Sequence, residues 1–357
     1  MLNALIIFGG MSSEHDVSLI SANSVIKNIP TDKYNVIMLG ITKDGEWLRY
    51  TGDVDLLPDE KWLSDTENCV KAIISPDAKD DGLITFEKDG TITKTHIDVV
   101  FPVLHGKNGE DGTIQGLFQL AQIPFVGCDS LSSGMSMDKS FTNRIADSFG
   151  VPQAKWTFCT AYTYGLDADK FINESADYLG FPIFVKPANA GSSVGISKAA
   201  NKAELKTAIE KAFECDTKIV LEESIDGREV ECAVLGNDEL TSSVVGEIIP
   251  CNEFYDYEAK YINGTSKLSI PADLPEEISK EIQENAKKIF AGLGCSGISR
   301  VDFFVRKSDN KVMFNEINTI PGFTSISMYP KLMDKIGIGY SELLDRAFTL
   351  AIDKWGK

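Results

Sequence analysis

Three features are missing from this sequence: long hydrophobic runs, early positive charge and paired cysteine motifs. The longest clean apolar stretch covers residues 99–104, whereas a helix that spans a bilayer needs roughly 20 apolar residues. No Lys or Arg precedes Lys27, and the apolar segment 4–8 is too short for the core of a signal peptide. We therefore expect neither a membrane span nor a secretory signal.

Cysteine is sparse and scattered. The seven cysteines are widely spaced without a C-x-x-C motif, and an odd number cannot all pair within one chain. Reduced, scattered thiols are typical of proteins in a reducing compartment. We therefore expect a cytoplasmic protein.

Positive charge is also scarce, with 35 Lys and Arg against 53 Asp and Glu and a net charge of −18. An acidic surface repels phosphate backbones and anionic lipid headgroups, which argues against nucleic-acid and membrane-surface partners. Small anionic ligands stay compatible with this charge if basic residues gather in one cleft. The length of 357 residues, with 43% hydrophobic and 25% charged content, predicts two or three globular domains.

The N-terminal third has the pattern of a parallel α/β sheet. A buried strand over residues 2–8 is followed by helical spacing over 16–29 and by a second strand over 34–41. A further buried strand over 97–104 leads into a short helix over 112–122. A strand, a helix and a strand in this order predict a parallel pair.

The pattern then changes, and we expect domain boundaries near residues 127 and 220. Later helices are predicted over 137–149, 204–215, 276–293 and 340–355. Later strands are predicted over 181–186, 194–197, 218–222, 230–235 and 243–249, mostly antiparallel in the last third. Residues 251–269 are polar and aromatic without a period, which predicts a long loop of the kind that is often functional.

Two short motifs match known signatures in the wrong context. Residues 292–297 match G-x-G-x-x-G, but a predicted helix precedes them and a strand follows, the reverse of the order in dinucleotide-binding sites. Residues 191–195 match the G-x-S-x-G of serine hydrolases, but all three histidines lie upstream of Ser193. We interpret the first motif as a helix end and a turn, and we reject a serine hydrolase.

An acidic hairpin is predicted around a polar turn at Asp309. If the flanking strands pair about this residue, Asp302 faces Glu316 and Arg300 faces Asn318, all on one side of the sheet. Two carboxylates and an amide carbonyl are hard oxygen ligands that suit Mg²⁺, and an arginine beside them can bind phosphate or an oxyanion. The alternative is a solvated hairpin. Directly opposed carboxylates repel each other, so a cation between them is favoured.

Basic and small residues offer candidates for anion binding. Lys139 opens a predicted helix and Lys186 ends an apolar strand, although either fits a surface lysine with its charge in water. The small-residue loop 189–193 offers backbone N–H groups and hydroxyls to a phosphate, although a plain hairpin turn fits it as well.

Two glycine-containing loops follow buried strands of the predicted parallel sheet, at residues 9–14 and 105–113. Ligands of α/β proteins bind at the carboxyl ends of such strands. Glu14 lies in the first loop, where it can bind a ligand or complement the positive end of the following helix. Both roles are compatible with one position.

Together these segments resemble the D-alanine–D-alanine ligases. Residues 105–116, with Glu110-Asp111-Gly112, resemble the first signature of that family, and residues 297–322 resemble the second. Residues 9–18 and 255–261 also fit, so the resemblance covers essentially the whole chain.

The resemblance implies the ATP-grasp fold, with α/β and α+β parts. It implies an N-terminal Rossmann-like parallel α/β substrate domain over 1–127, a central ATP-grasp domain over 128–220 and a C-terminal ATP-grasp domain with the Mg²⁺ site over 221–357. In the implied reaction ATP phosphorylates the carboxylate of one D-alanine to an acyl phosphate, which the amine of the second attacks, for peptidoglycan synthesis. The implied ligands are D-alanine, ATP and two Mg²⁺ ions, for which Mn²⁺ is expected to substitute, and the implied assembly is a homodimer.

The resemblance also implies a role for each matching residue. The implied ATP-binding residues are Lys139, Lys186, Ser193, Glu222, Glu223, Ile225, Glu229 and Lys260. The implied Mg²⁺ ligands are Asp302, Glu316 and Asn318, and the implied substrate-binding residues are Glu14, His105, Arg300, Ser327 and Met328. Arg300 and the N–H of Gly322 are implied to stabilise the oxyanion. Glu14, Ser192 and Tyr261 are implied to form a hydrogen-bonded triad that closes the loop 251–269.

Three other functions fit the sequence less well. A different ATP-grasp ligase conflicts with Glu14 and Tyr261, which belong to the amino-acid site of the family. A nucleotide-binding protein without catalysis would not need the complete set of Arg300, Asp302, Glu316 and Asn318 in the hairpin. The acidic net charge disfavours a Mg²⁺-dependent nuclease. The remaining alternative is a D-alanine–D-serine ligase of the glycopeptide-resistance type.

The acceptor choice depends on two positions. Ester-forming relatives carry His where this chain has Tyr261 beside Lys260, so D-lactate is excluded as acceptor. Residues 41–47 and 104–109 resemble the D-serine group, but that group has Arg at the position of Met328. A methionine accommodates a methyl group and offers no donor to a serine hydroxyl. We therefore expect D-alanyl-D-alanine as the main product and D-alanyl-D-serine as a slow side product.

Overall fold

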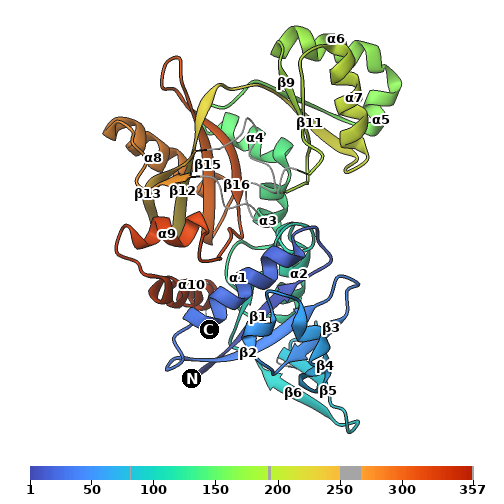
Figure 1. Cartoon of the computed structure of the whole chain (residues 1–357), viewed down its shortest axis with the longest axis vertical. Coiled ribbons are helices and arrows are strands. Elements are labelled where there is room, and N and C mark those ends of the chain that lie inside the picture. Colours follow the sequence, from blue (N-terminus) through green and yellow to red (C-terminus); the bar gives the residue numbers. More distant parts are fainter. Residues whose placement is uncertain (81, 192–193, 250–266, 356–357) are drawn as a thin grey trace.

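The computed structural model describes residues 1–80, 82–191, 194–249 and 267–355. Within these residues the strands form three sheets, each built from its own stretch of the chain (Figure 1). The N-terminal sheet lies at the bottom of the view, the central sheet at the top right and the C-terminal sheet at the upper left (Figure 1). None of the described helices is long and apolar enough to cross a membrane.

The N-terminal sheet is organised around β1, which pairs in parallel with β2 and with β7. Its first elements are β1 (Leu2–Gly9), α1 (His15–Asn28), β2 (Tyr34–Ile41), β7 (Val99–Pro102) and α2 (Thr113–Ala121). Alternate residues of β1 pack on opposite sides, Ile6 against α1 and α10 (Tyr340–Lys354), and Ile7 against α2. Because both faces are covered, β1 is apolar from Ala4 to Phe8. The prediction that the chain begins with a parallel α/β sheet is confirmed. The strand predicted over residues 97–104 is shorter in the structure, where it is β7.

The same sheet extends beyond β2 through antiparallel strands that were not predicted. They are β3 (Trp47–Tyr50), β4 (Cys69–Ile74), β5 (Gly82–Phe86) and β6 (Ile92–His96). These strands are short, and β6 is exposed along most of its length. A strand without a buried face carries no hydrophobic alternation, so periodicity does not detect it.

The central part contains a small sheet in the order β10-β9-β11-β8. Its strands are β8 (Trp156–Thr160), β9 (Ile183–Pro187), β10 (Ser197–Ala199) and β11 (Lys218–Glu223). Its helices are α5 (Ala161–Leu166), α6 (Ala168–Leu179) and α7 (Lys202–Phe213), which share a core with these strands. The returning strand predicted over 194–197 begins only at Ser197.

Two helices, α3 (Ser130–Met137) and α4 (Lys139–Ser148), come before this sheet. The helix predicted over 137–149 therefore starts later than expected. Asp138 separates the two helices because its backbone is extended and its carboxylate accepts a hydrogen bond from the N–H of Ser140 at 2.9 Å. This is an ordinary N-cap, and it places Lys139 at the first position of α4.

The C-terminal sheet is antiparallel, as predicted, in the order β14-β13-β12-β15-β16. Its strands are β12 (Gly227–Gly236), β13 (Leu240–Ile249), β14 (Lys267–Ser269), β15 (Gly297–Arg306) and β16 (Val312–Asn318). α8 (Glu276–Gly292) shares one core with this sheet, and α9 (Met328–Asp334) shares a second core with α10. The prediction of a loop over 251–269 is wrong at its end, because residues 267–269 pair with β13. The rest of that loop lies outside the described residues.

The register of the acidic hairpin is confirmed where it matters. Asp302 pairs with Glu316 and Arg300 pairs with Asn318. Beyond Asp302 the pairing shifts, and Phe303 faces Phe314, so Asn315 is the extra residue of a bulge. The predicted pairing, symmetric about Asp309, therefore holds for Arg300 and Asp302 but not for the residues between the bulge and the turn. Residues 292–297 join the end of α8 to the start of β15, as the interpretation of a turn required.

The last helix ties the two ends of the chain together. Asp345 of α10 accepts hydrogen bonds from Lys33 at 2.7 Å and from the hydroxyl of Tyr34 at 2.9 Å. The ring of Phe348 packs on Tyr34, with centroids 4.7 Å apart. These contacts hold the C-terminal sheet against the N-terminal sheet.

Candidate active site

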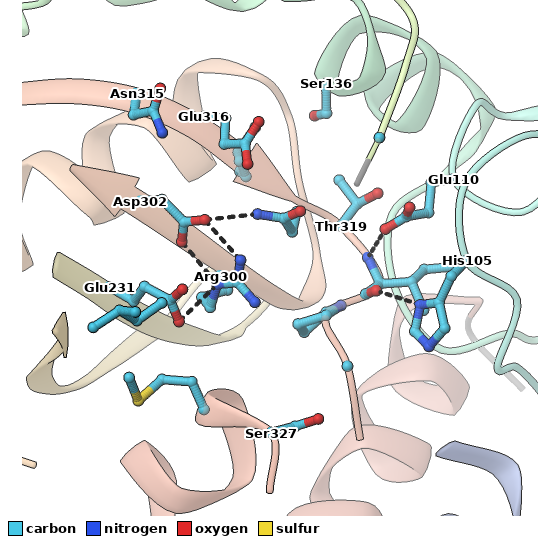
Figure 2. A pocket seen from close by; sticks show the side chains of 18 of the residues that line it. His105, Glu110, Ser136, Glu231, Arg300, Asp302, Asn315, Glu316, Thr319 and Ser327 are labelled. Carbon is cyan, nitrogen blue, oxygen red and sulfur yellow. Dashed lines mark hydrogen bonds and ion pairs between the residues drawn. The ribbon is translucent and has the colours of Figure 1, made fainter. Parts of the chain in front are cut away.

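A cavity of about 420 Å³ lies where the three parts of the chain meet. Each part contributes to its wall. The N-terminal part supplies Glu14, His105 and Glu110; the central part supplies Ser136, Lys139 and Gly191; the C-terminal part supplies Glu229, Arg300, Asp302, Glu316, Asn318, Gly322, Ser327 and Met328. Figure 2 shows His105 and Glu110 across the cavity from Asp302. Sequence positions far apart are therefore gathered around one space.

Arg300 is the central cation of the hairpin wall. Its Nε donates to Asp302 Oδ1 at 2.8 Å and its Nη2 to Asp302 Oδ2 at 2.7 Å. Glu231 Oε2 lies 3.0 Å from the same Nε (Figure 2). Glu231 of β12 faces Asp302 across the ladder, so three carboxylates, Glu231, Asp302 and Glu316, stand in one row across three strands. The guanidinium offsets part of their mutual repulsion.

The donor set of this row suits a divalent cation. Asp302 and Glu316 offer carboxylate oxygens and Asn318 offers an amide group, whose nitrogen donates to Asp302 Oδ2 at 3.0 Å. Among residues 1–80, 82–191, 194–249 and 267–355, no three His, Cys, Asp or Glu side chains are grouped to enclose a metal ion. Mg²⁺ commonly takes one or two protein carboxylates and completes its octahedron with water and phosphate oxygens. The residues present therefore fit a Mg²⁺ shared with a phosphate ligand.

Glu14 lies at the opposite wall, between two close backbone segments. It occupies the N-cap position of α1, but its side chain makes no capping hydrogen bond and is 7% exposed. A Cβ on Gly106 would lie 2.4 Å from Glu14 Oε2, and one on Gly191 would lie 2.9 Å from the same atom. The two glycines therefore leave room for this carboxylate at the cavity. Helix capping does not explain its position.

His105 is buried and uses both ring nitrogens. Nδ1 lies 3.1 Å from the carbonyl oxygen of Ile320, and Nε2 lies 3.1 Å from Ser21 Oγ. A carbonyl can only accept, so Nδ1 carries the proton and Nε2 accepts from the Ser21 hydroxyl. Burial lowers the pKa of His105, against the opposite effect of Glu14. The ring is therefore neutral and fixed in one tautomer.

Glu110 stands beside Glu14 in the same wall. Its pKa is raised to about 8, chiefly because the carboxyl is withdrawn from water and also because of the charge of Glu14. Glu110 Oε2 accepts a hydrogen bond from Gly106 N at 2.8 Å, and Oε1 accepts one from Ile320 N at 3.3 Å. Sequence reasoning quoted this residue within a motif but gave it no role.

The two candidate lysines differ in their surroundings. Lys139 Nζ donates to the carbonyl of Ala190 at 2.8 Å and lies 4.0 Å from Glu316 Oε2. Lys186 is outside the cavity wall and pairs with Glu222 Oε2 at 2.6 Å, while its Nζ donates to Asn315 Oδ1 at 3.4 Å. Burial alone would lower the pKa of Lys186, but the charge and hydrogen bond of Glu222, together with the charges of Glu316 and Glu229, outweigh burial and the pKa is raised. Lys186 is therefore cationic.

The residues predicted to hold the adenosine, Glu229 at the ribose and the other three at the adenine, are split by the cavity. Glu229 lines the cavity, whereas Glu222, Glu223 and Ile225 do not. Glu223 Oε1 instead accepts a hydrogen bond from Lys155 N at 2.9 Å. Glu222 remains linked to the cavity through Lys186 and Asn315.

The remaining wall is formed around the start of α9. Ser327 Oγ lies 2.8 Å from Thr324 Oγ1 and accepts from Thr324 N at 2.9 Å. A Cβ on Gly322 would lie 2.8 Å from Ser327 Oγ, so only glycine permits this approach. Met328 is 5% exposed, and Lys331 one turn later also lines the cavity. Sequence reasoning missed Lys331 and Glu231. Lys331 lies four residues after Ser327, and positions four apart on a helix share a face, so this spacing could have indicated Lys331.

Four predicted site residues, Ser192, Ser193, Lys260 and Tyr261, lie outside the described residues. The triad that includes Ser192 and Tyr261, and the nucleotide contacts of Ser193 and Lys260, therefore stay predictions.

Comparisons with known proteins agree across the chain. The family model described as D-ala D-ala ligase N-terminus matches residues 3–128, and the one described as D-ala D-ala ligase C-terminus matches residues 145–349. A D-alanine–D-alanine ligase of Caldicellulosiruptor bescii is 52% identical over 353 residues, 99% of this chain and 96% of that protein. One of Acetivibrio thermocellus is 52% identical over 362 residues, 98% of this chain and 96% of that protein.

Solved structures agree as well. The VanG D-Ala:D-Ser ligase from Enterococcus faecalis superposes with a TM-score of 0.89 at 44% identity, covering 98% of this chain and 99% of that one. The D-alanine-D-alanine ligase from Coxiella burnetii gives a TM-score of 0.86 at 32% identity, with 99% and 96% covered. The fold is accordingly that of the ATP-grasp enzymes. Within that class, the chain belongs to the D-alanine–D-alanine ligase family.

Proposed function

We propose that this protein joins two D-alanines to D-alanyl-D-alanine with consumption of ATP, as a step of peptidoglycan synthesis. The observation that carries the proposal is the hairpin register, which gathers Arg300, Asp302, Glu316 and Asn318 at one cavity in a chain of this family. Family membership implies ATP as the energy source and Mg²⁺ as its companion. Two Mg²⁺ ions with Glu316 between them, and replacement by Mn²⁺, are the finer part of the proposal.

The first D-alanine binds at the Glu14 wall. Its ammonium pairs with the Glu14 carboxylate, which is held in a narrow space by Gly106 and Gly191. Its carboxylate then points across the cavity toward Arg300. His105, neutral and held by two hydrogen bonds, shapes the same wall.

The phosphates of ATP lie between the lysines and the acidic row. Lys139 and Lys186 offer positive charge from the central part, while Glu222, Glu223, Ile225 and Glu229 are proposed to hold the adenosine. Asp302, Glu316 and Asn318 would hold Mg²⁺, which would neutralise part of the phosphoryl charge. Transfer of the γ-phosphoryl group to the first carboxylate needs positioning and charge compensation more than covalent help from the protein.

Arg300 and the N–H of Gly322 are proposed to face the negative charge that develops on the carbonyl oxygen of the attacked acyl group. The amine of the second D-alanine adds to the acyl phosphate, its carboxylate held near Ser327, and phosphate leaves as the peptide bond forms. Preorganised donors in a site without bulk water are a large source of rate enhancement. Ser192 and Tyr261 with Glu14 are proposed to keep water out when the loop 251–269 closes, because an acyl phosphate is readily hydrolysed.

A D-alanine–D-serine ligase is the second candidate, because the VanG ligase superposes over nearly the whole chain. Met328 favours the first candidate, since an apolar side chain accepts a methyl group and gives a hydroxyl no partner. Such a pocket rejects an added hydroxyl by only about 10²-fold. D-alanyl-D-serine is therefore expected as a slow side product.

We further propose a homodimer in the cytoplasm and the three-domain division at residues 127 and 220. Within the described residues, one sheet from each of the three stretches supports a division into three. Because β11 (Lys218–Glu223) belongs to the central sheet and runs across residue 220, the second boundary is better placed between Glu223 and Gly227.

The test has two steps. Release of phosphate from ATP is measured with and without D-alanine, and dependence on D-alanine is expected. Equal D-alanine and D-serine are then offered together and the products are identified by mass. A majority of D-alanyl-D-alanine supports the proposal, whereas a majority of the mixed dipeptide would move the protein to the second candidate. No dependence on either amino acid would refute both.

A further inference from the structure

The backbone between the hairpin and the acceptor wall is held from the N-terminal part of the chain. Ile320 lies just after β16, and its side chain is 3% exposed. Its N–H donates to Glu110 Oε1 at 3.3 Å, and its carbonyl accepts from His105 Nδ1 at 3.1 Å. Figure 2 draws both interactions as dashed lines from the labelled side chains of His105 and Glu110.

These two bonds fix two successive peptide planes. The N–H of Ile320 belongs to the plane before its Cα and the carbonyl to the plane after it. The second plane contains the nitrogen of Pro321, whose ring restrains φ. Few soft torsions therefore separate the held peptide from the N–H of Gly322, which is proposed to face the oxyanion.

Glu110 is itself anchored in its loop. Its second oxygen, Oε2, accepts from Gly106 N at 2.8 Å, and its own N–H donates to the Gly106 carbonyl at 2.9 Å. Gly106 in turn approaches Glu14, so one short loop contacts both the Glu14 carboxylate and the Ile320 peptide. A displacement of either element is therefore transmitted to the other.

We propose that Glu110 is a positioning residue which, together with His105, clamps the Ile320 peptide and so aligns Gly322 and Ser327 with the first-substrate wall. The inference rests on the proposed function for its catalytic consequence. The clamp itself stands on the contacts alone. Glu110 acts through the backbone of the 319–322 segment and need not touch either substrate.

A matched control is available in the neighbouring residue. Asp111 accepts hydrogen bonds from Asn108 N at 2.8 Å and from Thr113 N at 3.0 Å, both within its own loop. Asp111→Ala therefore removes the carboxylate next to Glu110 but leaves the hydrogen bonds between the 106–113 loop and the C-terminal part intact. Glu110→Ala removes the two side-chain bonds, to Ile320 N and to Gly106 N, and Glu110→Gln keeps one acceptor oxygen.

Amide hydrogen exchange of the substrate-free protein tests the clamp directly. We expect exchange in the segment 319–322 to rise about 10-fold or more in Glu110→Ala and less in Glu110→Gln, because a protecting hydrogen bond is lost. Asp111→Ala should raise exchange only within residues 106–113. Wild-type exchange at 319–322 in Glu110→Ala, with a native circular dichroism spectrum, would overturn the clamp.

Kinetics then separate positioning from general damage. We expect Glu110→Ala to lower kcat and raise the KM of the second D-alanine, each about 10-fold, with the nucleotide Kd unchanged. Asp111→Ala should change neither by more than about twofold. Equal losses in nucleotide and amino-acid binding would refute a positioning role. If the wild type showed no reaction with D-alanine, the proposed function would fail while the exchange result would still decide the clamp.

Discussion

The two opposite walls of the cavity are built by different means. At the hairpin wall, Arg300, Asp302 and Glu316 stand on regular antiparallel strands, and the register places them on one face. At the loop wall, Glu14 and Glu110 stand on turns, where they are held by close backbone approaches and by hydrogen bonds to distant segments. Register follows from a period of two along the chain. Close approaches follow from tertiary contacts that no local pattern contains.

The largest expected effect tests the hairpin wall. Asp302→Asn or Glu316→Gln should lower turnover by about 10³-fold or more, because a charged oxygen ligand of the proposed Mg²⁺ is lost. The fold should remain, since removing one of two opposed carboxylates relieves repulsion. Steady-state kinetics, thermal unfolding and Mn²⁺ binding in the presence of ADP provide the measurements.

Asp309→Asn is the matched control in the same hairpin. Asp309 lies at the turn, away from the cavity. Its carboxylate forms an ion pair with Arg306 at a distance of 2.6 Å. We expect this variant to retain full turnover and Mn²⁺ binding. Normal Mg²⁺-dependent activity in Asp302→Asn or Glu316→Gln would rule out the metal assignment.

The second effect concerns the arginine between the carboxylates. Arg300→Ala should cost about 3–4 kcal/mol at the transition state, as the loss of one preorganised oxyanion donor does. The KM of ATP should change far less than kcat. Arg300→Lys serves as the control because it retains the charge beside Asp302 and Glu231. An Arg300→Ala protein whose only defect is a raised KM for ATP would restrict this residue to nucleotide binding.

These predictions fall where sequence reasoning worked best. The pairing of Asp302 with Glu316 needed only an assumed turn at Asp309 and alternation along two strands, and the bulge at Asn315 left it intact. The buried β1 was equally accessible, because its apolar run lies between two helix layers. In both cases local pattern and tertiary placement agree.

Sequence reasoning did less well where the structure depends on contacts without a period. The exposed β6 has no buried face to create alternation. Helical spacing does not reveal Asp138 as an N-cap, so α4 begins two residues later than the helix predicted from residue 137. Glu110 was quoted in a motif, but its bond to Ile320 joins residues 210 positions apart, which no local spacing contains.

The third effect tests the loop wall. Gly106 has φ +71° and a Cβ there would meet Glu14, whereas Gly90 has φ +86° with open space around it. Both Gly106→Ala and Gly90→Ala should lose about 1–2 kcal/mol of stability from left-handed backbone. Only Gly106→Ala should also raise the KM of the first D-alanine, by about 10- to 100-fold, because the Glu14 carboxylate is displaced. Equal KM values in the two variants would show that Glu14 does not bind the first substrate.

The smallest effect is a pH dependence of stability at the same wall. The pKa of Glu110 is raised from 4.5 to about 8 in the folded protein, first by withdrawal of the carboxyl from water and then by the charge of Glu14. The folded state therefore binds more protons than the unfolded state between these two values. The contribution of Glu110 to the free energy of unfolding is present in full at low pH, and it declines as the pH rises through this window.

Urea unfolding of the wild type and Glu110→Gln from about pH 5 to about pH 8 measures this decline, which the variant should lack. The charged groups that act on Glu110 are Glu14 and Arg300, and both act on His105 as well; all three residues are retained in both proteins. The lowered pKa of His105 acts with the opposite sign, because the folded state then binds fewer protons, but it acts equally in both proteins. The difference between the two proteins therefore isolates Glu110. Parallel pH profiles would mean that this carboxyl ionises as it does in water, and that the loop wall is wetter than its contacts indicate.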